Sequence, residues 1–153
     1  MTGGTRQLVD AFCEGAAAQE GIVLSVRRAD EAQPGELVAA DAALFATPEN
    51  LGAMAGMMKD FFDRSYYAAL GRVEGRPYAT LVCAGSDGQG AARQIARIAT
   101  GWRMKPVAEP LIVITHAQTP EAILAPKRID AAALARARRL GATLAAGVSM
   151  GIW

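Results

Sequence analysis

From Ala42 to Arg64 the sequence reads AALFATPENLGAMAGMMKDFFDR. Its first six residues form a nearly continuous apolar run that ends at Pro48, which is typical of a strand buried on both faces, as in a parallel sheet. A short loop, Glu49–Gly52, follows, and the spacing of apolar residues then predicts a helix from about residue 53 to 67. A buried strand that leads through a loop into a helix is the repeating unit of an α/β protein.

The same alternation continues on both sides of this stretch. Further strands are predicted at Ile22–Val26, Tyr78–Ala84 and Val107–Thr115, and Pro110 within the last one suits an edge strand or a bulge. Further helices are predicted at Thr5–Glu20, Glu36–Ala40, Ala91–Trp102 and Ile129–Gly147. Alternating helices and strands indicate a parallel sheet with helices on both faces, so we expect one α/β domain over residues 1–153.

Composition narrows the possible functions. The formal net charge is +1, which argues against the clustered basic surface of nucleic-acid-binding domains, and no apolar run approaches the ~20 residues of a membrane span. Arg136, Arg138 and Arg139 cluster on an Ala-rich helix, where a solvated face is the simplest interpretation. The two cysteines form neither a metal-ligand set nor a disulfide framework, so we expect a cytoplasmic protein without a bound metal.

Three loops between the predicted helices and strands are rich in Gly, hydroxyl and amide groups. They are Thr2–Arg6 at the start of the first helix, Pro48–Gly52, and Gly85–Gly90. In an open α/β sheet, ligands bind at the carboxyl ends of the strands, where the last two loops belong. A Gly-rich turn at a helix start is a cradle for phosphate, because free backbone N–H groups and the helix dipole favour an anion there. The three loops together predict a nucleotide-type ligand.

Two of these segments resemble a known family. Thr2-Gly3-Gly4-Thr5 resembles the second half of the Thr/Ser-x-Thr-Gly-Asn-Thr phosphate loop of flavodoxin-like proteins. The segment from Pro48 to Arg64 resembles Pro-x-x-x-Gly-x-Met-x-Gly-x-x-Lys-x-Phe-x-Asp-Arg of FMN-dependent NAD(P)H oxidoreductases and quinone reductases, including the tryptophan-repressor-binding-protein-like (WrbA-type) enzymes. The resemblance implies a flavodoxin-like three-layer sandwich that binds FMN non-covalently.

The resemblance also implies where FMN would lie. The 5′-phosphate would be held by Thr2, Gly3, Gly4, Thr5 and Arg6. One side of the isoalloxazine ring would be lined by Pro48, Glu49, Asn50, Leu51 and Gly52. The other side, with the pyrimidine edge, would be lined by Ser86, Asp87, Gly88 and Gln89.

The implied activity is ping-pong transfer of hydride from NADPH or NADH to FMN and then to a quinone or similar acceptor. No protein nucleophile is needed, because the flavin carries the redox chemistry. One alternative is a flavodoxin-type electron carrier, although such carriers are typically acidic with aromatic residues stacked on the flavin. This chain is nearly neutral, and neither ring loop contains an aromatic residue. The other alternative is a flavodoxin-like domain that no longer binds FMN.

The phosphate turn departs from the family pattern in two ways. Gly4 stands where Asn is usual, and the strand that carries the first hydroxyl of the loop is missing before Met1. In the family that strand lies in the centre of the sheet. Either the natural chain starts ~8–10 residues earlier, or Ile22–Val26 lies beside Ala42–Thr47, or a partner donates a strand. We favour the earlier start and predict that a chain beginning at Met1 binds FMN weakly or not at all.

Some side chains allow both a functional and a structural interpretation. The only histidine, His116, could protonate a bound quinone, but a structural or exposed histidine is more common. Cys83 near the ring is best interpreted as an inert buried thiol. The predicted helix carries too many aromatic residues for one buried face, so we expect part of this set to contact a second subunit in a homodimer or larger oligomer: Phe61, Phe62, Tyr66 and Tyr67.

Overall fold

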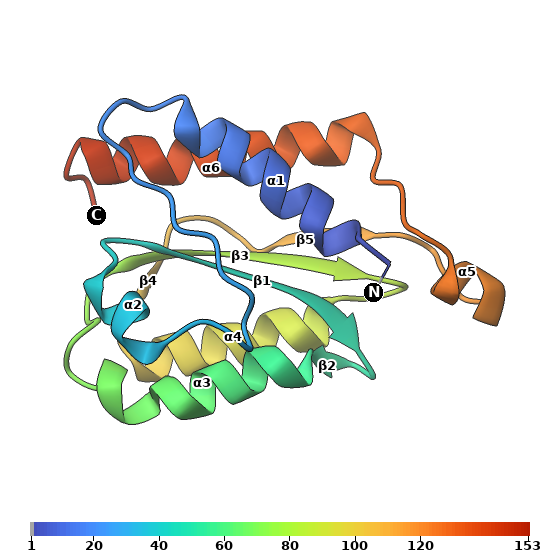
Figure 1. The fold of residues 1–153 in the computed structure, drawn as a ribbon, viewed down its shortest axis with the longest axis horizontal. Coiled ribbons are helices and arrows are strands. Elements are labelled where there is room, and N and C mark those ends of the chain that lie inside the picture. Colours follow the sequence, from blue (N-terminus) through green and yellow to red (C-terminus); the bar gives the residue numbers. More distant parts are fainter. Residues whose placement is uncertain (1) are drawn as a thin grey trace.

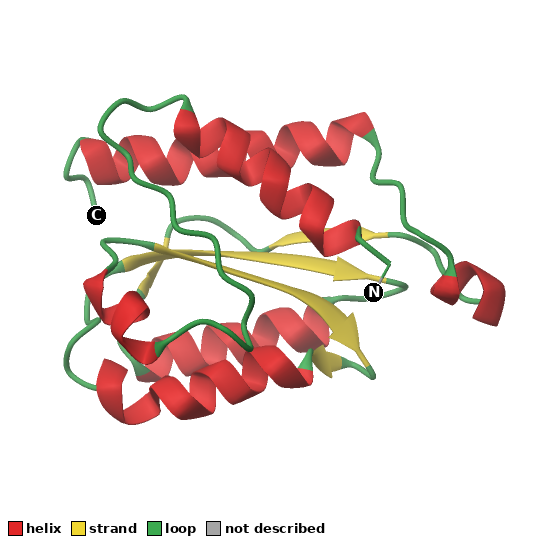
Figure 2. Cartoon of the chain, viewed as in Figure 1, coloured by secondary structure: helices red, strands yellow, loops and turns green. Residues whose placement is uncertain are grey.

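The structure is a computed structural model that describes residues 2–153; Met1 lies outside the described residues. Its elements follow the order α1 (Gly4–Ala17), α2 (Pro34–Ala39), β1 (Ala43–Asn50), β2 (Ala53–Met54), α3 (Gly56–Ala69), β3 (Pro77–Ala84), α4 (Gln89–Gly101), β4 (Lys105–Pro106), β5 (Leu111–Ile114), α5 (Pro120–Leu124) and α6 (Ala131–Ser149). Helices α1 and α6 cover one face of the sheet, and α3 and α4 cover the other (Figures 1 and 2). This arrangement confirms the expected three layers.

The sheet is built around β3. On one side β3 pairs in parallel with β1 over Ala43–Pro48, and on the other side it pairs in parallel first with β4 and then with β5. Every residue of β3 is buried, as its unbroken apolar sequence predicts. The short strand β2 is antiparallel to the end of β1, so the sheet is mixed and not purely parallel as expected.

One predicted strand is wrong and another forms only in part, as β5. Residues 22–28 run extended but pair with no strand among residues 2–153, so Ile22–Val26 does not lie in the sheet beside Ala42–Thr47. β-branched residues favour an extended backbone, but a strand also needs a neighbour to accept its hydrogen bonds. The predicted strand Val107–Thr115 is interrupted, since β4 ends at Pro106 and β5 begins only after Pro110, which cannot donate to the ladder.

One edge of β1 is open. Glu49 and Asn50 pair with β2 on that side, but no strand of residues 2–153 pairs there with Ala43–Pro48. Phe45 and Thr47 are buried, whereas Leu44 and Ala46 are only partly buried. The expectation that this strand is buried on both faces therefore holds only in part: Leu44 and Ala46 pack against the core beneath α1 and α6 but stay partly exposed. Beside it, Val23 and Val26 of the extended segment are exposed by 94% and 53%.

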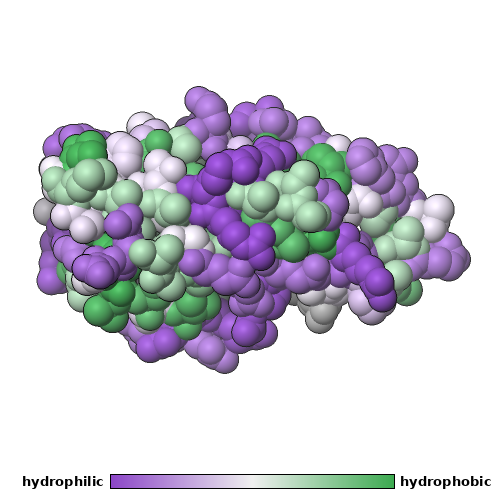
Figure 3. Space-filling view, turned by 90° about the horizontal axis from the view of Figure 1, so that it is seen from above, coloured by the Kyte–Doolittle hydropathy of each residue, from purple (hydrophilic) through white to green (hydrophobic). Residues whose placement is uncertain are grey.

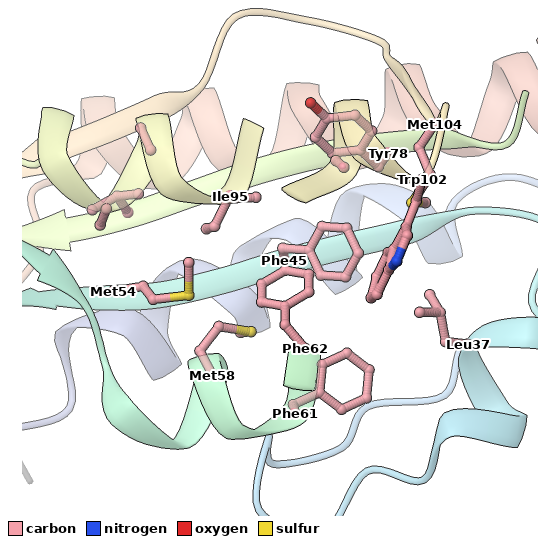
Figure 4. Packing of buried hydrophobic residues seen from close by; sticks show 14 of the residues in the cluster. Leu37, Phe45, Met54, Met58, Phe61, Phe62, Tyr78, Ile95, Trp102 and Met104 are labelled. Carbon is pink, nitrogen blue, oxygen red and sulfur yellow. The ribbon is translucent and has the colours of Figure 1, made fainter. Parts of the chain in front are cut away.

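Aromatic residues fill the core between the sheet and the helices α3 and α4 (Figure 4). Phe45 of β1 packs on Phe62 of α3 with ring centroids 4.9 Å apart, and Phe62 contacts Trp102 at 5.5 Å. The four aromatic residues of α3 divide between core and solvent: Phe61 and Phe62 are buried, whereas Tyr66 and Tyr67 are exposed. Their contact with a second subunit stays a prediction.

Glycines bring α1 and α6 into backbone contact above the other face of the sheet. A Cβ at Gly15 of α1 would overlap the carbonyl oxygen of Arg138, and a Cβ at Gly141 of α6 would overlap that of Phe12. Next to this contact Arg138 Nε donates to Glu14 Oε2 at 2.6 Å. Seen from the side of α1 and α6, the surface mixes hydrophilic and hydrophobic residues (Figure 3).

Candidate functional site

The three predicted loops lie at one edge of the sheet, beyond the carboxyl ends of β1 and β3 (Figure 1). Gly4 packs directly on the end of β3, since a Cβ there would lie 2.7 Å from Cys83 Sγ. The Pro48–Gly52 loop meets the start of α4 at Gly90, where a Cβ would overlap the carbonyl oxygen of Gly52. Glycine at these two positions lets the backbones approach closely.

The start of α1 is uncapped. Gly3 at the N-cap has φ +82° and offers no side chain, and the N–H groups of Gly4, Thr5 and Arg6 have no acceptor among residues 2–153. Such a helix end carries a partial positive charge and binds anions well. Arg6 is exposed and currently bonds Asp10, with Nε–Oδ1 2.9 Å. An exposed pair of this kind is weak, so the guanidinium is free to turn to another anion.

Two residues that the sequence patterns did not single out support this turn. Gln7 of α1 donates to Lys127 O at 2.7 Å and accepts from Ile129 N at 3.1 Å, which ties the turn to the segment before α6. Lys127 N in turn donates to Thr2 O at 2.7 Å. The Lys127 ammonium group caps the end of α5 by donating to the carbonyl oxygens of Ala122, Ile123 and Ala125.

The second loop is the tight hairpin between β1 and β2. Its two turn residues, Leu51 and Gly52, have φ +53° and +71°, a conformation that leucine rarely adopts. Leu51 is fully exposed at the tip. A strained apolar side chain held in solvent beside a candidate site is a feature that often serves ligand binding.

Glu49 joins the second loop to the third. Its carboxylate accepts from Gly88 N at 2.7 Å and from Ala91 N at 3.0 Å, so it caps the start of α4. Nearby, Gln94 Oε1 accepts from Met54 N at 2.9 Å. The structure therefore gives Glu49 a positioning role between the two loops, in addition to the predicted place beside a ring.

The third loop leaves its polar side chains free. The side chains of three residues are exposed: Ser86, Asp87 and Gln89. Gly88 is buried with φ +82°, and a Cβ there would lie 3.3 Å from Ala84 Cβ.

The loop after β5 lies next to this third loop, because a Cβ at Gly85 would lie 3.0 Å from Ala117 O. This places exposed His116, with φ +54°, at the same edge. Its exposure agrees with the interpretation of this histidine as structural or exposed.

Cys83 is closed in beneath the phosphate turn. Burial raises the pKa of its thiol, and the Lys127 ammonium group lowers it by a smaller amount. We expect iodoacetamide at about pH 8 to leave Cys83 of a folded Cys13→Ser variant unmodified, because the thiolate is the reactive form. The same variant unfolded in urea is the control and should react fully. Rapid alkylation of the folded variant would contradict the buried, protonated thiol.

Other kinds of site find little support in the part of the chain that the structure describes. Residues 2–153 bring together no group of three or more His, Cys, Asp or Glu side chains that could hold a metal ion. None of the described helices has the length and apolar character needed to cross a membrane. Two cavities occur away from the loop edge, one at α6 and one beside α4.

Comparison with known proteins agrees with the geometry. Residues 31–119 match the family model "NADPH-dependent FMN reductase". A flavodoxin of Aquifex aeolicus is 30% identical over 97 residues, which cover 62% of this chain and 50% of the relative. An NAD(P)H dehydrogenase (quinone) of Acidithiobacillus ferrooxidans is 32% identical over 85 residues, 42% of each chain. The chain thus spans about half the length, or less, of the curated relatives it matches.

Solved structures show the same fold. A flavodoxin from the domain Archaea superposes with a TM-score of 0.78 at 20% identity, covering 97% of this chain and 93% of that one. A WrbA-like flavodoxin from Agrobacterium tumefaciens gives a TM-score of 0.72 at 18% identity, covering 97% and 91%. With a flavodoxin-like fold and a family match over more than half of its length, the chain belongs to the NADPH-dependent FMN reductase family.

Proposed function

We propose that this chain binds FMN at the loop edge and serves as an NAD(P)H-dependent oxidoreductase that reduces a small acceptor such as a quinone. The observation that carries the proposal is that three Gly-rich loops lie at one edge of the sheet (Figure 1), and that one of them is the uncapped start of α1. The family match and the names of the relatives support an FMN-linked redox function. When bound, FMN would supply the hydride and electron chemistry.

The residues of the edge suit such a group. Free N–H groups at Gly4, Thr5 and Arg6 suit a phosphate, and there is no space for a side chain at Gly4. A planar ring would lie between the hairpin Pro48–Gly52 and the loop Ser86–Gln89. Glu49 holds these two loops at a fixed separation through its bonds to α4. Fixed loops help binding because less conformational entropy is lost.

An enzyme suits this edge better than an electron carrier. The ring loops present Leu51 and polar groups but no aromatic side chain, so one face of a bound ring would stay accessible to a nicotinamide or an acceptor. The nearly neutral charge of the chain also differs from the acidic surface typical of carriers. The relative from Aquifex aeolicus is nevertheless named a flavodoxin, so the carrier stays the second candidate.

The direct test is titration of FMN with the protein, followed by reduction. We expect saturable quenching of FMN fluorescence, and loss of the flavin absorption band when NADPH or NADH is added without oxygen. Quenching without loss of the band would favour the carrier. No quenching at any protein concentration would overturn the proposal and would agree with the sequence-based prediction that a chain beginning at Met1 does not hold FMN. The predicted weakness of binding is tested by the same dissociation constant.

A further inference from the structure

A cavity lies where β4 and β5 separate, away from the loop edge. Tyr78 of β3 pairs with Pro106 and Leu81 pairs with Leu111, so residues 107–110 bulge past the middle of β3. Together with Ala96 and Thr100 of α4 these residues enclose about 380 Å³. This volume is at the lower end of the range for small-molecule pockets.

Two buried hydroxyl groups open into this cavity. Tyr78 and Thr80 are each only 4% exposed, and they stand two residues apart on the same face of β3. Among residues 2–153 neither hydroxyl has a hydrogen-bond partner. Neither is sealed in protein either, since the fully enclosed unpaired atoms among these residues are Ser65 Oγ and Trp102 Nε1. Both oxygens therefore keep some exposed surface, and both residues line the cavity.

The Tyr78 hydroxyl is oriented and protonated to donate a hydrogen bond. Figure 4 shows the Tyr78 hydroxyl pointing away from Phe45 and Phe62. Burial raises the pKa of Tyr78, so its phenol keeps its proton at neutral pH and can donate a hydrogen bond. A ligand that hydrogen-bonds to these hydroxyls in place of water gains a modest net free energy for each bond.

The rest of the lining defines the ligand class. Ala96, Val107, Pro106 and Pro110 give apolar walls, which suit a flat hydrocarbon ring. The single charged residue of the lining is Glu109, whose carboxylate disfavours anions. We propose that this cavity binds a small neutral ring compound that carries a hydroxyl or carbonyl oxygen, held by hydrogen bonds to Tyr78 and Thr80. The site is separate from the proposed FMN edge and does not depend on it.

Three small probes test the site on the full chain. They are 4-methylphenol, toluene, which lacks the oxygen, and 4-methylbenzoate, which is an anion of similar size. Methyl signals of Ala96 and Val107 are followed by NMR during each titration. We expect saturable shifts with 4-methylphenol, and affinity lower by about fivefold or more for toluene and for 4-methylbenzoate, since each hydrogen bond contributes modestly.

Variants then identify the hydroxyls. Tyr78→Phe and Thr80→Val should each lower the affinity for 4-methylphenol by about fivefold and leave the affinity for toluene unchanged. Tyr66→Phe, which removes an exposed hydroxyl on α3, is the matched control and should change neither. Equal affinities for 4-methylphenol and toluene, or shifts scattered away from the cavity, would overturn the proposal. That comparison uses the unmodified protein, so it decides even if a variant fails to fold.

Discussion

Gly141→Ala is expected to lower the free energy of unfolding by about 2–3 kcal/mol, because overpacking a close contact forces the backbone to move. The new Cβ would overlap the carbonyl oxygen of Phe12 and would lie 2.9 Å from its carbon and 3.1 Å from Ala16 N. These are backbone atoms of α1, so no side-chain rotation can relieve the overlap. Urea unfolding followed by circular dichroism measures the loss.

Gly15→Ala tests the same contact from the other helix. Its Cβ would overlap the carbonyl oxygen of Arg138 and lie 2.7 Å from the adjoining carbon, so a similar loss is expected. Gly101→Ala is the matched control: it lies in α4 with no heavy atom within 4 Å of the new Cβ. Alanine favours helix over glycine, so the control should be as stable as the parent or slightly more stable. Parental stability of Gly141→Ala would show that α1 and α6 separate at no cost.

Gly90→Ala is expected to weaken FMN binding by about tenfold or more, equivalent to about 1.4 kcal/mol. Its Cβ would overlap Gly52 O, lie 2.8 Å from Gly52 C and lie 3.2 Å from Glu49 Oε2. The hairpin must therefore move off the start of α4. Because the two loops would no longer hold a ring between them, affinity should fall even where the protein stays folded. Fluorescence titration of FMN measures the change.

Gly101→Ala again serves as the control, since it makes the same substitution in the same helix without a neighbouring atom. Urea unfolding of both variants separates a loss of affinity from a loss of fold. If folded Gly90→Ala binds FMN like the parent, the ring does not lie between these two loops. FMN would then have to place its ring elsewhere on the protein.

Much of the fold could be predicted where burial alone decides it. The predicted strand Tyr78–Ala84 differs from the observed strand β3 by one residue at its start. Every residue of β3 is buried, and burial of this kind is visible in the sequence. The four longer helices were predicted with shifts of a few residues at their ends. The segment Ile22–Val26 shows the limit: its residues favour extension, but no sequence pattern supplies the neighbouring strand.

Smaller elements were missed for local reasons. Helix α5 has only five residues and was not predicted. Its sequence nevertheless marks an N-terminus, because Thr119 is followed by Pro120. In the structure Thr119 Oγ1 accepts a hydrogen bond from Ala122 N at 3.2 Å. The β1–β2 hairpin has no such signal in its sequence. Its turn begins with Leu51 in the left-handed region, where Asn or Gly is the expected residue.

The candidate site also has features that the sequence predicts and features that it does not. Sequence spacing predicted which loops meet at one edge, because parallel strands end on the same side. It could not predict that Gln7 bonds to Lys127, 120 residues away, or that Glu49 caps α4. Such contacts depend on the final packing of distant segments, and no short motif marks them.

The open edge of β1 makes the sheet unequal in its exchange of amide hydrogen with solvent. Along β3, both sides of the strand are bonded, so its amides should exchange deuterium only when the protein opens widely. Along Ala43–Pro48, every second amide faces the side without a strand and should exchange within a small local fluctuation. A strand that exchanges quickly therefore lies directly beside the slowest strand of this sheet.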